Sequence, residues 1–273
     1  SLAEILPTGA TTIYELGLGS EEMVEKIGNS GLRAYIGLSS CPSKTYTPDG
    51  KRIENTKMDL DFGYQRLEEN IARKEKYEGS YHDRIRFTLF PGQDESTPPE
   101  FLREVKRLAD LHKMKLTIHV GQSIQEYEYI IQQYGVSPAQ YLVDNGICGP
   151  DVFWTHYVLR SGHHLNPLIF PGELELMAET KTNLVHCPWV LTRRGFLMES
   201  MQMYLDKGIN VVFGTDTFPQ DMLNDMRSAA TSCKIAESNP FVGTAATVFN
   251  MATVGAAKAF GRDDLGGLAP GAK

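Results

Sequence analysis

The sequence of 273 residues is 41% hydrophobic and 22% charged, which provides enough apolar material for a substantial core and excludes an intrinsically disordered chain. Lys and Arg number 27 against 34 for Asp and Glu, and the resulting net charge of -7 disfavours a nucleic-acid-binding surface. No run approaches the roughly 18 to 20 uncharged apolar residues of a membrane span, and no basic segment leads into an apolar run at the start. We therefore expect a cytoplasmic, globular protein with a small-molecule partner and no nucleic-acid or membrane partner.

The cysteines are widely spaced and include no Cys-x-x-Cys pair; they are Cys41, Cys148, Cys187 and Cys233. This spacing predicts neither a zinc clip nor a disulfide framework, and it fits a reducing compartment.

Seven short runs rich in β-branched and aromatic residues predict strands. They are Thr11 to Leu16, Arg33 to Leu38, Ile85 to Phe90, Lys115 to Val120, Val152 to Val158, Asn183 to Cys187 and Asn210 to Phe213. Amphipathic stretches of helix length separate most of them, for example the segment that starts near Pro98-Pro99 and continues to His112. This alternation predicts parallel strands, either in a doubly wound sheet or in a (β/α)8 barrel.

A doubly wound nucleotide-binding fold would place a glycine-rich turn after its first strand. The segment Leu16-Gly17-Leu18-Gly19-Ser20 matches that turn only in part, because the third glycine is missing. A barrel instead gathers its chemical residues at the carboxyl ends of successive strands. The sequence follows the barrel rule, since His119, His156, His186 and Asp216 lie at or just after the ends of consecutive runs.

Two long loops, from about Ser39 to Asp59 and from Arg160 to Pro171, each follow a predicted strand. In a barrel such loops overhang the active face and shape the substrate pocket. The second loop contains His163 and His164, for which we expect a solvated surface or a lid contact. Arg193 and Arg194 form either a solvated pair or a clamp for a substrate carboxylate.

Three histidines and an aspartate at strand ends are a donor set for zinc, iron or manganese. A bound divalent ion lowers the pKa of its water to about 7, which makes hydrolysis feasible at neutral pH. The strand ends therefore predict a metal site at which hydrolysis is feasible.

The chain resembles the amidohydrolase superfamily, in particular the branch of triazine hydrolases and of guanine and adenosine-derivative deaminases. The matching stretches follow in the family's order and spacing: Leu116 to Ser123 with Glu126, Trp154-Thr155-His156, Leu184 to Pro188, Phe213 to Asp216, Ala252 to Ala256, Gly266-Gly267-Leu268 and Pro270-Gly271. This resemblance implies a TIM-type barrel and hydrolysis of C–N bonds in a small compound. It also implies a homo-oligomer.

The resemblance implies a role for each strand-end residue. His119 would be a metal ligand, and Asp216 a ligand that also accepts a proton from the attacking water and returns it to the leaving group. His156 would be a base or polariser beside that leaving group. His186 and Trp189 are expected in the substrate pocket, where Trp189 adds an aromatic wall that relatives lack.

Two departures from the family pattern stand out. No His-x-His pair occurs in the sequence, although the family carries one on its first strand, and the tail ends at Gly271-Ala272-Lys273, where relatives continue into a small β-sandwich. We therefore expect residues 1–273 to be an incomplete barrel domain, an internal portion that lacks the first strand and the sandwich. Gln122 stands where deaminases of this branch carry glutamate, and an amide cannot shuttle a proton, so Gln122 is expected to position substrate and argues against ordinary deamination.

Two other functions stay open at this point. The chain could be a non-catalytic barrel that acts as a binding or scaffolding protein, which Gln122 and the missing His-x-His favour. A dinucleotide-binding oxidoreductase would rest on the partial glycine turn alone.

Overall fold

Parallel strands in consecutive order form the framework of the chain. The computed structural model describes residues 2–17 and 19–273. They divide into two compact units: the N-terminal unit, mainly Ala10–Ile147, and the C-terminal unit, Ala3–Gly9 together with Cys148–Lys273.

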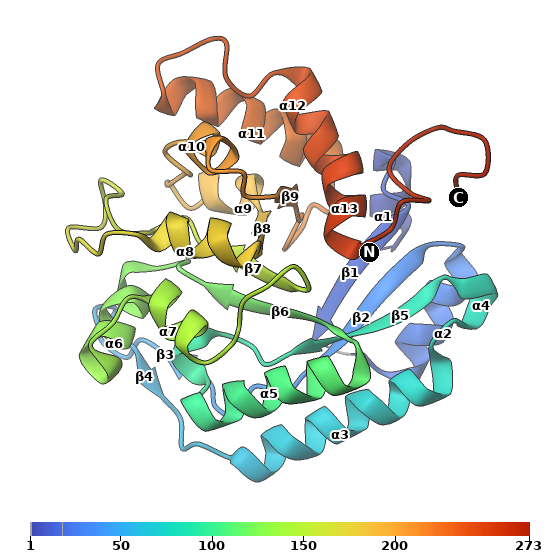
Figure 1. Cartoon of the computed structure of the whole chain (residues 1–273), viewed down its shortest axis with the longest axis horizontal. Coiled ribbons are helices and arrows are strands. Elements are labelled where there is room, and N and C mark those ends of the chain that lie inside the picture. Colours follow the sequence, from blue (N-terminus) through green and yellow to red (C-terminus); the bar gives the residue numbers. More distant parts are fainter. Residues whose placement is uncertain (1, 18) are drawn as a thin grey trace. The chain divides into compact units, whose positions relative to one another are not determined.

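The N-terminal unit contains four parallel strands in the order β1-β2-β5-β6 (Figure 1). They are β1 (Thr12–Gly17), β2 (Arg33–Ser39), β5 (Ile85–Phe90) and β6 (Lys115–Val120). Each strand lies beside its predecessor with no reversal of order, which is typical of a barrel and unlike the switch point of a doubly wound sheet. Leu18, at the centre of the partial glycine turn, lies outside the described residues.

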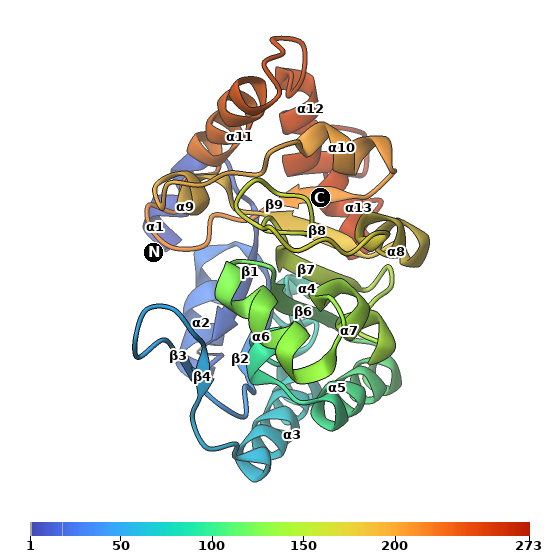
Figure 2. The same ribbon diagram turned by 90° about the vertical axis from the view of Figure 1, so that its left-hand side faces the viewer.

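The helices of this unit begin and end where the sequence supplies caps. They are α2 (Glu21–Ser30), α3 (Leu60–Tyr77), α4 (Ser80–Asp83), the 3-10 turn η2 (Asp94–Ser96), α5 (Pro99–His112), α6 (Ile124–Tyr134) and α7 (Pro138–Asp144). The Ser123 hydroxyl accepts a hydrogen bond from Glu126 N at the start of α6, and Gly135, with φ of 74°, ends it. Helices α3 and α5 lie side by side (Figures 1 and 2), with α3 against β2 and β5, and α5 against β5 and β6.

The loop after β2 contains a small antiparallel pair that the sequence patterns do not predict. Strands β3 (Thr45–Tyr46) and β4 (Glu54–Asn55) pair within it. Two residues per strand are too few to show alternation, so no periodic signal exists.

The C-terminal unit contains three parallel strands in the order β7-β8-β9. They are β7 (Val152–His156), β8 (Asn183–His186) and β9 (Val211–Phe213). Its helical segments are α1 (Leu2–Ile5), the 3-10 turn η1 (Leu6–Thr8), α8 (Glu173–Thr180), α9 (Pro188–Thr192), α10 (Met201–Asp206), α11 (Met222–Ala236), α12 (Ala245–Asn250), the π-helical turn η3 (Met251–Gly255) and α13 (Ala256–Phe260). The α11 helix packs against α9 and α12, while η3 and α13 pack against β9.

Burial on both faces of the strands explains their apolar composition. All five residues of β7 are buried, and β2 is buried along its central five positions. Parallel strands covered on both faces read as continuous apolar runs, and this made them visible in the sequence.

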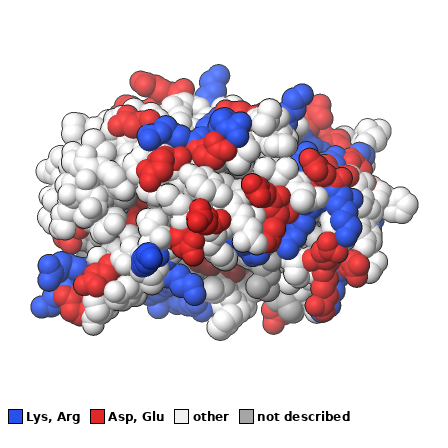
Figure 3. Space-filling model, turned by 90° about the horizontal axis from the view of Figure 1, so that it is seen from below, with Lys and Arg blue, Asp and Glu red and all other residues white. Residues whose placement is uncertain are grey.

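The surface carries charges of both signs. Figure 3 shows acidic and basic side chains interspersed over one face of the molecule. None of the described helices is both long and apolar enough to cross a membrane.

The buried hydroxyl of Tyr204 allows the contribution of one buried hydrogen bond to the stability of the fold to be measured. It donates a 2.9 Å hydrogen bond to the carbonyl of Tyr157 just after β7, whereas the exposed Tyr46 hydroxyl bonds Glu54 at 3.0 Å. We expect Tyr204→Phe to lower the free energy of unfolding by about 1–3 kcal/mol, because a buried carbonyl loses its partner. Tyr46→Phe should change it by less than about 0.5 kcal/mol. Urea unfolding measures both variants, and equal effects would contradict the role of the buried bond.

Candidate functional site

The carboxyl ends of β7, β8 and β9 meet at one edge of their sheet. Thr155 pairs with Val185, and His186 with Phe213. Because parallel strands share a direction, His156 and His186 end neighbouring strands, and Asp216 follows three residues after the end of β9. The structure therefore brings three of the sequence-predicted site residues to one edge of the C-terminal unit.

His156 and Asp216 lie closest to each other. The His156 Nε2 atom is 3.9 Å from Asp216 Oδ2, a distance that permits an ion pair when the imidazole is protonated. The His156 side chain is buried, and the Asp216 side chain keeps 28% of its surface exposed. An imidazole and a carboxylate in this arrangement can exchange protons with a molecule bound beside them.

The backbone at this edge is strained. His156, Tyr157 and Asp216 have φ values of 80°, 33° and 52°, a region that residues other than glycine rarely adopt. Such conformations persist only where the surrounding structure enforces them, and they cluster at functional sites. The left-handed turn also explains why β7 ends at His156 and not at Val158 as predicted.

His186 is a neutral, buried imidazole. Burial lowers its pKa from the usual 6.5 to about 3, and its Nδ1 atom is buried with no hydrogen-bond partner. A neutral imidazole nitrogen with a free lone pair can accept a proton, a hydrogen bond or a metal ion.

Asp225 on α11 is a buried carboxyl that sequence reasoning missed. Its Oδ1 atom accepts a 3.1 Å hydrogen bond from the backbone N–H of Trp189, and its Oδ2 atom is buried without a partner. Burial raises the pKa of Asp225 to about 7, with smaller contributions from the charges of Asp221 and Asp216. The available signal was its helical spacing from Ala229 and Cys233, which places a carboxyl on the buried face of α11.

Of the three remaining predicted site residues, Trp189 lies in α9 of the C-terminal unit, and His119 and Gln122 belong to the N-terminal unit. His119 is the fifth residue of β6, its backbone N–H bonds the carbonyl of Gly92 at 3.0 Å, and its ring lies 5.2 Å from that of Phe90. Gln122 follows in the next turn, where its backbone N–H donates to Glu126 Oε2 at 3.0 Å. The buried Glu126 carboxylate therefore holds the turn that presents Gln122.

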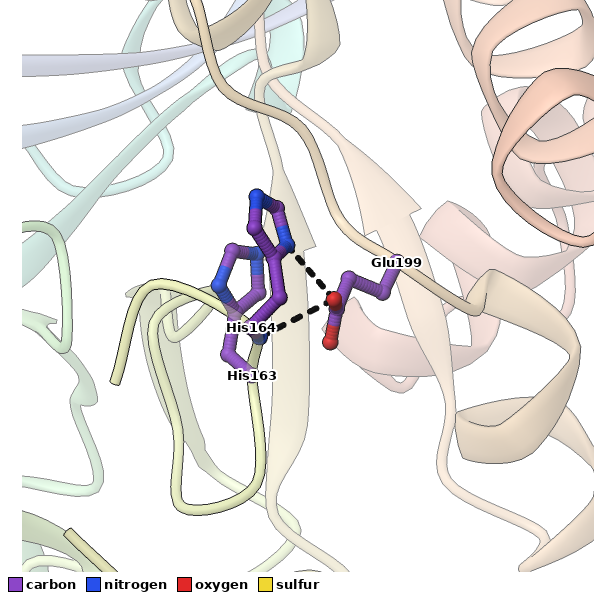
Figure 4. A group of neighbouring side chains, drawn as sticks. All are labelled: His163, His164 and Glu199. Atoms are coloured by element: carbon purple, nitrogen blue, oxygen red, sulfur yellow. Dashed lines mark hydrogen bonds and ion pairs between the residues drawn. The ribbon is translucent and has the colours of Figure 1, made fainter. Parts of the chain in front are cut away.

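His163, His164 and Glu199 form a second group, drawn in Figure 4. The Nδ1 atom of His163 accepts from Leu165 N at 3.1 Å, so its Nε2 carries the proton and donates to the Leu197 carbonyl at 3.0 Å. Both ring nitrogens are thus engaged, and neither offers a lone pair to a metal.

His164 ties the loop of this group to Glu199, with its Nδ1 atom 2.6 Å from Glu199 Oε1. The group thus joins the loop after β7 to the segment before α10. His164 is exposed, which agrees with the expected solvated surface, whereas His163 is buried.

Arg193 is exposed, as expected for a solvated side chain, but its guanidinium is engaged in contacts and is not free to clamp a substrate. Its guanidinium donates to Thr217 Oγ1 at 2.7 Å and to the Phe218 carbonyl at 3.0 Å, and it lies over the Phe218 ring. These contacts stabilise the loop that follows Asp216.

The nitrogen and oxygen donors of the C-terminal unit suit a divalent metal ion. Neutral imidazole nitrogens and carboxylate oxygens are the usual zinc ligands in hydrolases. His186 presents a buried, unpartnered nitrogen, and the partly exposed Asp216 carboxylate lies beside His156.

Comparison with known proteins identifies clear parallels in sequence. A model described as "Amidohydrolase family" matches residues 1–273. The chain is 29% identical over 262 residues to a 5-methylthioadenosine/S-adenosylhomocysteine deaminase of Thermococcus onnurineus, covering 94% of this chain and 56% of the relative. The corresponding deaminase of Haloarcula marismortui is 28% identical over 266 residues, 96% of this chain and 56% of the relative. The chain thus spans little more than half the length of these relatives.

Solved structures share the fold. An adenosine deaminase of Xanthomonas campestris with bound zinc has a TM-score of 0.75 at 22% identity, covering 97% of this chain and 56% of that chain. A guanine deaminase of C. acetobutylicum with bound guanine has a TM-score of 0.79 at 19% identity, covering 97% of this chain and 61% of that chain. The prediction of a barrel-type α/β fold related to triazine hydrolases and deaminases is confirmed.

The low pKa of His186 predicts a specific pH dependence of stability. The unfolded chain binds a proton at this histidine below about pH 6.5, but the folded chain does so only below about 3, so folding is disfavoured as the pH falls between them. We expect the free energy of unfolding of metal-free protein, relative to His186→Asn, to rise by about 1.4 kcal/mol per pH unit between about pH 4 and 6. Urea unfolding across this range measures it. Parallel pH curves for the two proteins would contradict a neutral buried His186.

Proposed function

Because the chain belongs to the amidohydrolase family, we propose that it carries the catalytic residues of a metal-dependent hydrolase acting on C–N bonds of a small molecule. Amide, amidine, urea and amine-type bonds, including those of cyclic compounds, form the substrate class. The observation that carries the proposal is the pair of His156 and Asp216, 3.9 Å apart on strained backbone at the carboxyl edge of the strands. The similarity to relatives named as deaminases supports the bond type.

In this proposal His119 and Asp216 hold one divalent metal, zinc in preference to iron or manganese. The metal, when bound, would lower the pKa of a water molecule and thereby make it a nucleophile at neutral pH. Asp216 accepts the proton of the attacking water and returns it to the leaving group, acting first as general base and then as general acid. No nucleophilic side chain is required.

His156, Gln122, His186 and Trp189 serve the substrate. His156 polarises the scissile group, because its buried imidazole can donate a hydrogen bond to a developing negative charge. Gln122 holds a carbonyl or ring nitrogen by a hydrogen bond, since its amide offers both a donor and an acceptor. His186 and Trp189 line the pocket on the side of β8.

Metal content tests the ligand assignment. We expect the whole gene product, purified without added metal, to contain about one zinc per chain, and His119→Ala and Asp216→Asn to lose both the metal and hydrolytic activity. His82→Ala is the matched control, because His82 is an exposed histidine of the same chain, and it should retain the metal. Elemental analysis gives the content and also distinguishes zinc from iron and manganese.

Wild-type protein that contains no metal even after incubation with zinc, iron and manganese would overturn this function. That result would favour a non-catalytic barrel that binds a partner.

Gln122 tests the type of reaction. A glutamate at this position can donate a proton to a leaving amine or a ring nitrogen, which the amide cannot. We expect Gln122→Glu to raise the rate of ammonia release from aminopurine nucleosides by about 10²–10⁴-fold over the wild type. Equal rates for the wild type and Gln122→Glu would show that Gln122 does not select against deamination. Gln122→Asn is the control, because it keeps the amide group and shortens the side chain.

A further inference from the structure

Three buried carboxyl groups converge in the N-terminal unit, apart from the residues of the proposed hydrolytic site. Asp94 and Glu95 lie on η2, directly after β5, and Glu126 lies in the first turn of α6. Each carboxyl offers an oxygen atom, and these oxygens lie within 4.8 Å of one another. The side chains are almost inaccessible, with 1%, 4% and 0% of their surfaces exposed.

The hydrogen bonds of these carboxyls leave two oxygens unsatisfied. Asp94 Oδ1 accepts from Glu95 N at 2.8 Å, and the Glu126 carboxylate accepts from the backbone N–H groups of Gly121 and Gln122. In contrast, Asp94 Oδ2 and Glu95 Oε2 are buried and have no hydrogen-bond partner. A buried oxygen of this kind loses its hydration without compensation and therefore requires a ligand or a proton.

Among the described residues, no Lys, Arg or His forms a salt bridge with Asp94, Glu95 or Glu126. Burial raises the pKa of all three carboxyls, that of Glu126 to about 8. The charge of Glu126 raises the pKa of Asp94 further, and the charge of Glu95 does the same for Glu126. Without a cation the group can persist near neutral pH only by retaining protons.

We propose that Asp94, Glu95 and Glu126 form a structural binding site for a hard divalent cation, with Ca²⁺ as the preferred ion. This site shares no ligand with the proposed hydrolytic metal site.

The ligand chemistry selects the cation. All three ligands are carboxylate oxygens, which hard cations prefer, whereas zinc and copper favour sites that include nitrogen or sulfur. Calcium binds oxygens at 2.3–2.6 Å, so two oxygens on opposite sides of it are about 4.6–5.2 Å apart. Magnesium, at 2.0–2.1 Å, allows only about 4.0–4.2 Å. Oxygens that all lie within 4.8 Å of one another are close enough to bind one calcium ion together. Magnesium also sheds its waters reluctantly, which disfavours it in a site that is almost inaccessible to solvent.

The position of the site gives it a structural role. A cation held here would join the loop after β5 to the first turn of α6, and Glu126 already holds the backbone of Gly121 and Gln122. The ion would therefore fix the turn that follows β6. Ca²⁺ binding is expected to stabilise the N-terminal unit and to leave the ligands of the hydrolytic metal unchanged.

The test measures Ca²⁺ binding with zinc present at a fixed concentration in every sample, so that nitrogen-containing sites stay occupied. Calorimetric titration should give one Ca²⁺ per chain, and Mg²⁺ should bind more weakly. Tb³⁺, a luminescent substitute for Ca²⁺, should be sensitised by tyrosine excitation, because Tyr129 bonds Asn55, which in turn bonds the carbonyl of Glu95. At a hundredfold excess over Kd, Ca²⁺ should raise the melting temperature by about 5–10 °C.

The double variant Asp94→Asn/Glu95→Gln should lose Ca²⁺ binding, Tb³⁺ luminescence and the thermal shift. It should fold, because the amide oxygen introduced at position 94 can still accept from the backbone N–H of residue 95, and the substitutions remove like charges from a buried place. Glu25→Gln, on the exposed face of α2, is the matched control and should bind as the wild type does.

Two results would overturn the site: no binding of Ca²⁺, Mg²⁺ or Tb³⁺ to the wild type, or binding unchanged in the double variant. The first would mean that protons neutralise the carboxyls, and the second that the ion binds elsewhere. If the double variant does not fold, the single variant Glu95→Gln takes its place. A Ca²⁺-dependent rise in melting temperature that is smaller in Glu95→Gln than in the wild type would support the site, and an equal rise would overturn it.

Discussion

Consecutive parallel pairing of the strands is the constraint on which the chemistry of this chain depends. When β7, β8 and β9 run in one direction, their carboxyl ends share an edge, and side chains separated by 30 or more residues in sequence become neighbours. The same rule in the N-terminal unit places the turn after β5 beside β6, where Gln93 forms a bridge with His119. The pairing of the strands therefore determines which polar residues become neighbours.

This arrangement concentrates buried polar groups where the strands end. His186 has an unpartnered ring nitrogen, Asp225 an unpartnered carboxyl oxygen, and Asp94 another. In an ordinary core each of these groups would be destabilising by about 1–3 kcal/mol. His186 ends β8, Asp94 lies in the segment after β5, and Asp225 on α11 bonds the backbone of Trp189, just after β8. These positions indicate that the groups are kept for ligands, protons or positioning. The strained backbone of His156 and Asp216 lies at the same ends of the C-terminal strands as His186.

The strands could be predicted because burial on both faces leaves a simple sequence pattern. The runs Ile85 to Phe90 and Lys115 to Val120 coincide with β5 and β6, and the others differ by one or two residues at their ends. The differences have local causes. For β7 the strand stops where His156 and Tyr157 adopt positive φ, which no apolar pattern reveals. The two-residue strands β3 and β4 were invisible for lack of length.

The candidate site was predictable only in part, because a side chain's burial is a tertiary property. The sequence indicated His156 and Asp216 through their places after strands, and the structure shows them 3.9 Å apart. Asp94 and Glu95 lie in a polar stretch before two prolines, which reads as the exposed start of a helix, yet both are buried. Nothing local distinguishes a solvated acidic turn from one that the fold encloses.

Gln122 was indicated by the sequence, but the contacts that position it are visible only in the structure. Its backbone is held by Glu126, a member of the buried carboxyl group, so the position of the residue depends on a cluster that the sequence did not reveal. A glutamate at 122 would add another negative charge to a turn that already approaches one buried carboxylate, and its ionised form would be disfavoured there. An amide keeps the hydrogen-bonding capacity without that charge. Glutamine at position 122 is therefore consistent both with the electrostatics of the turn and with a reaction that needs no proton from this residue.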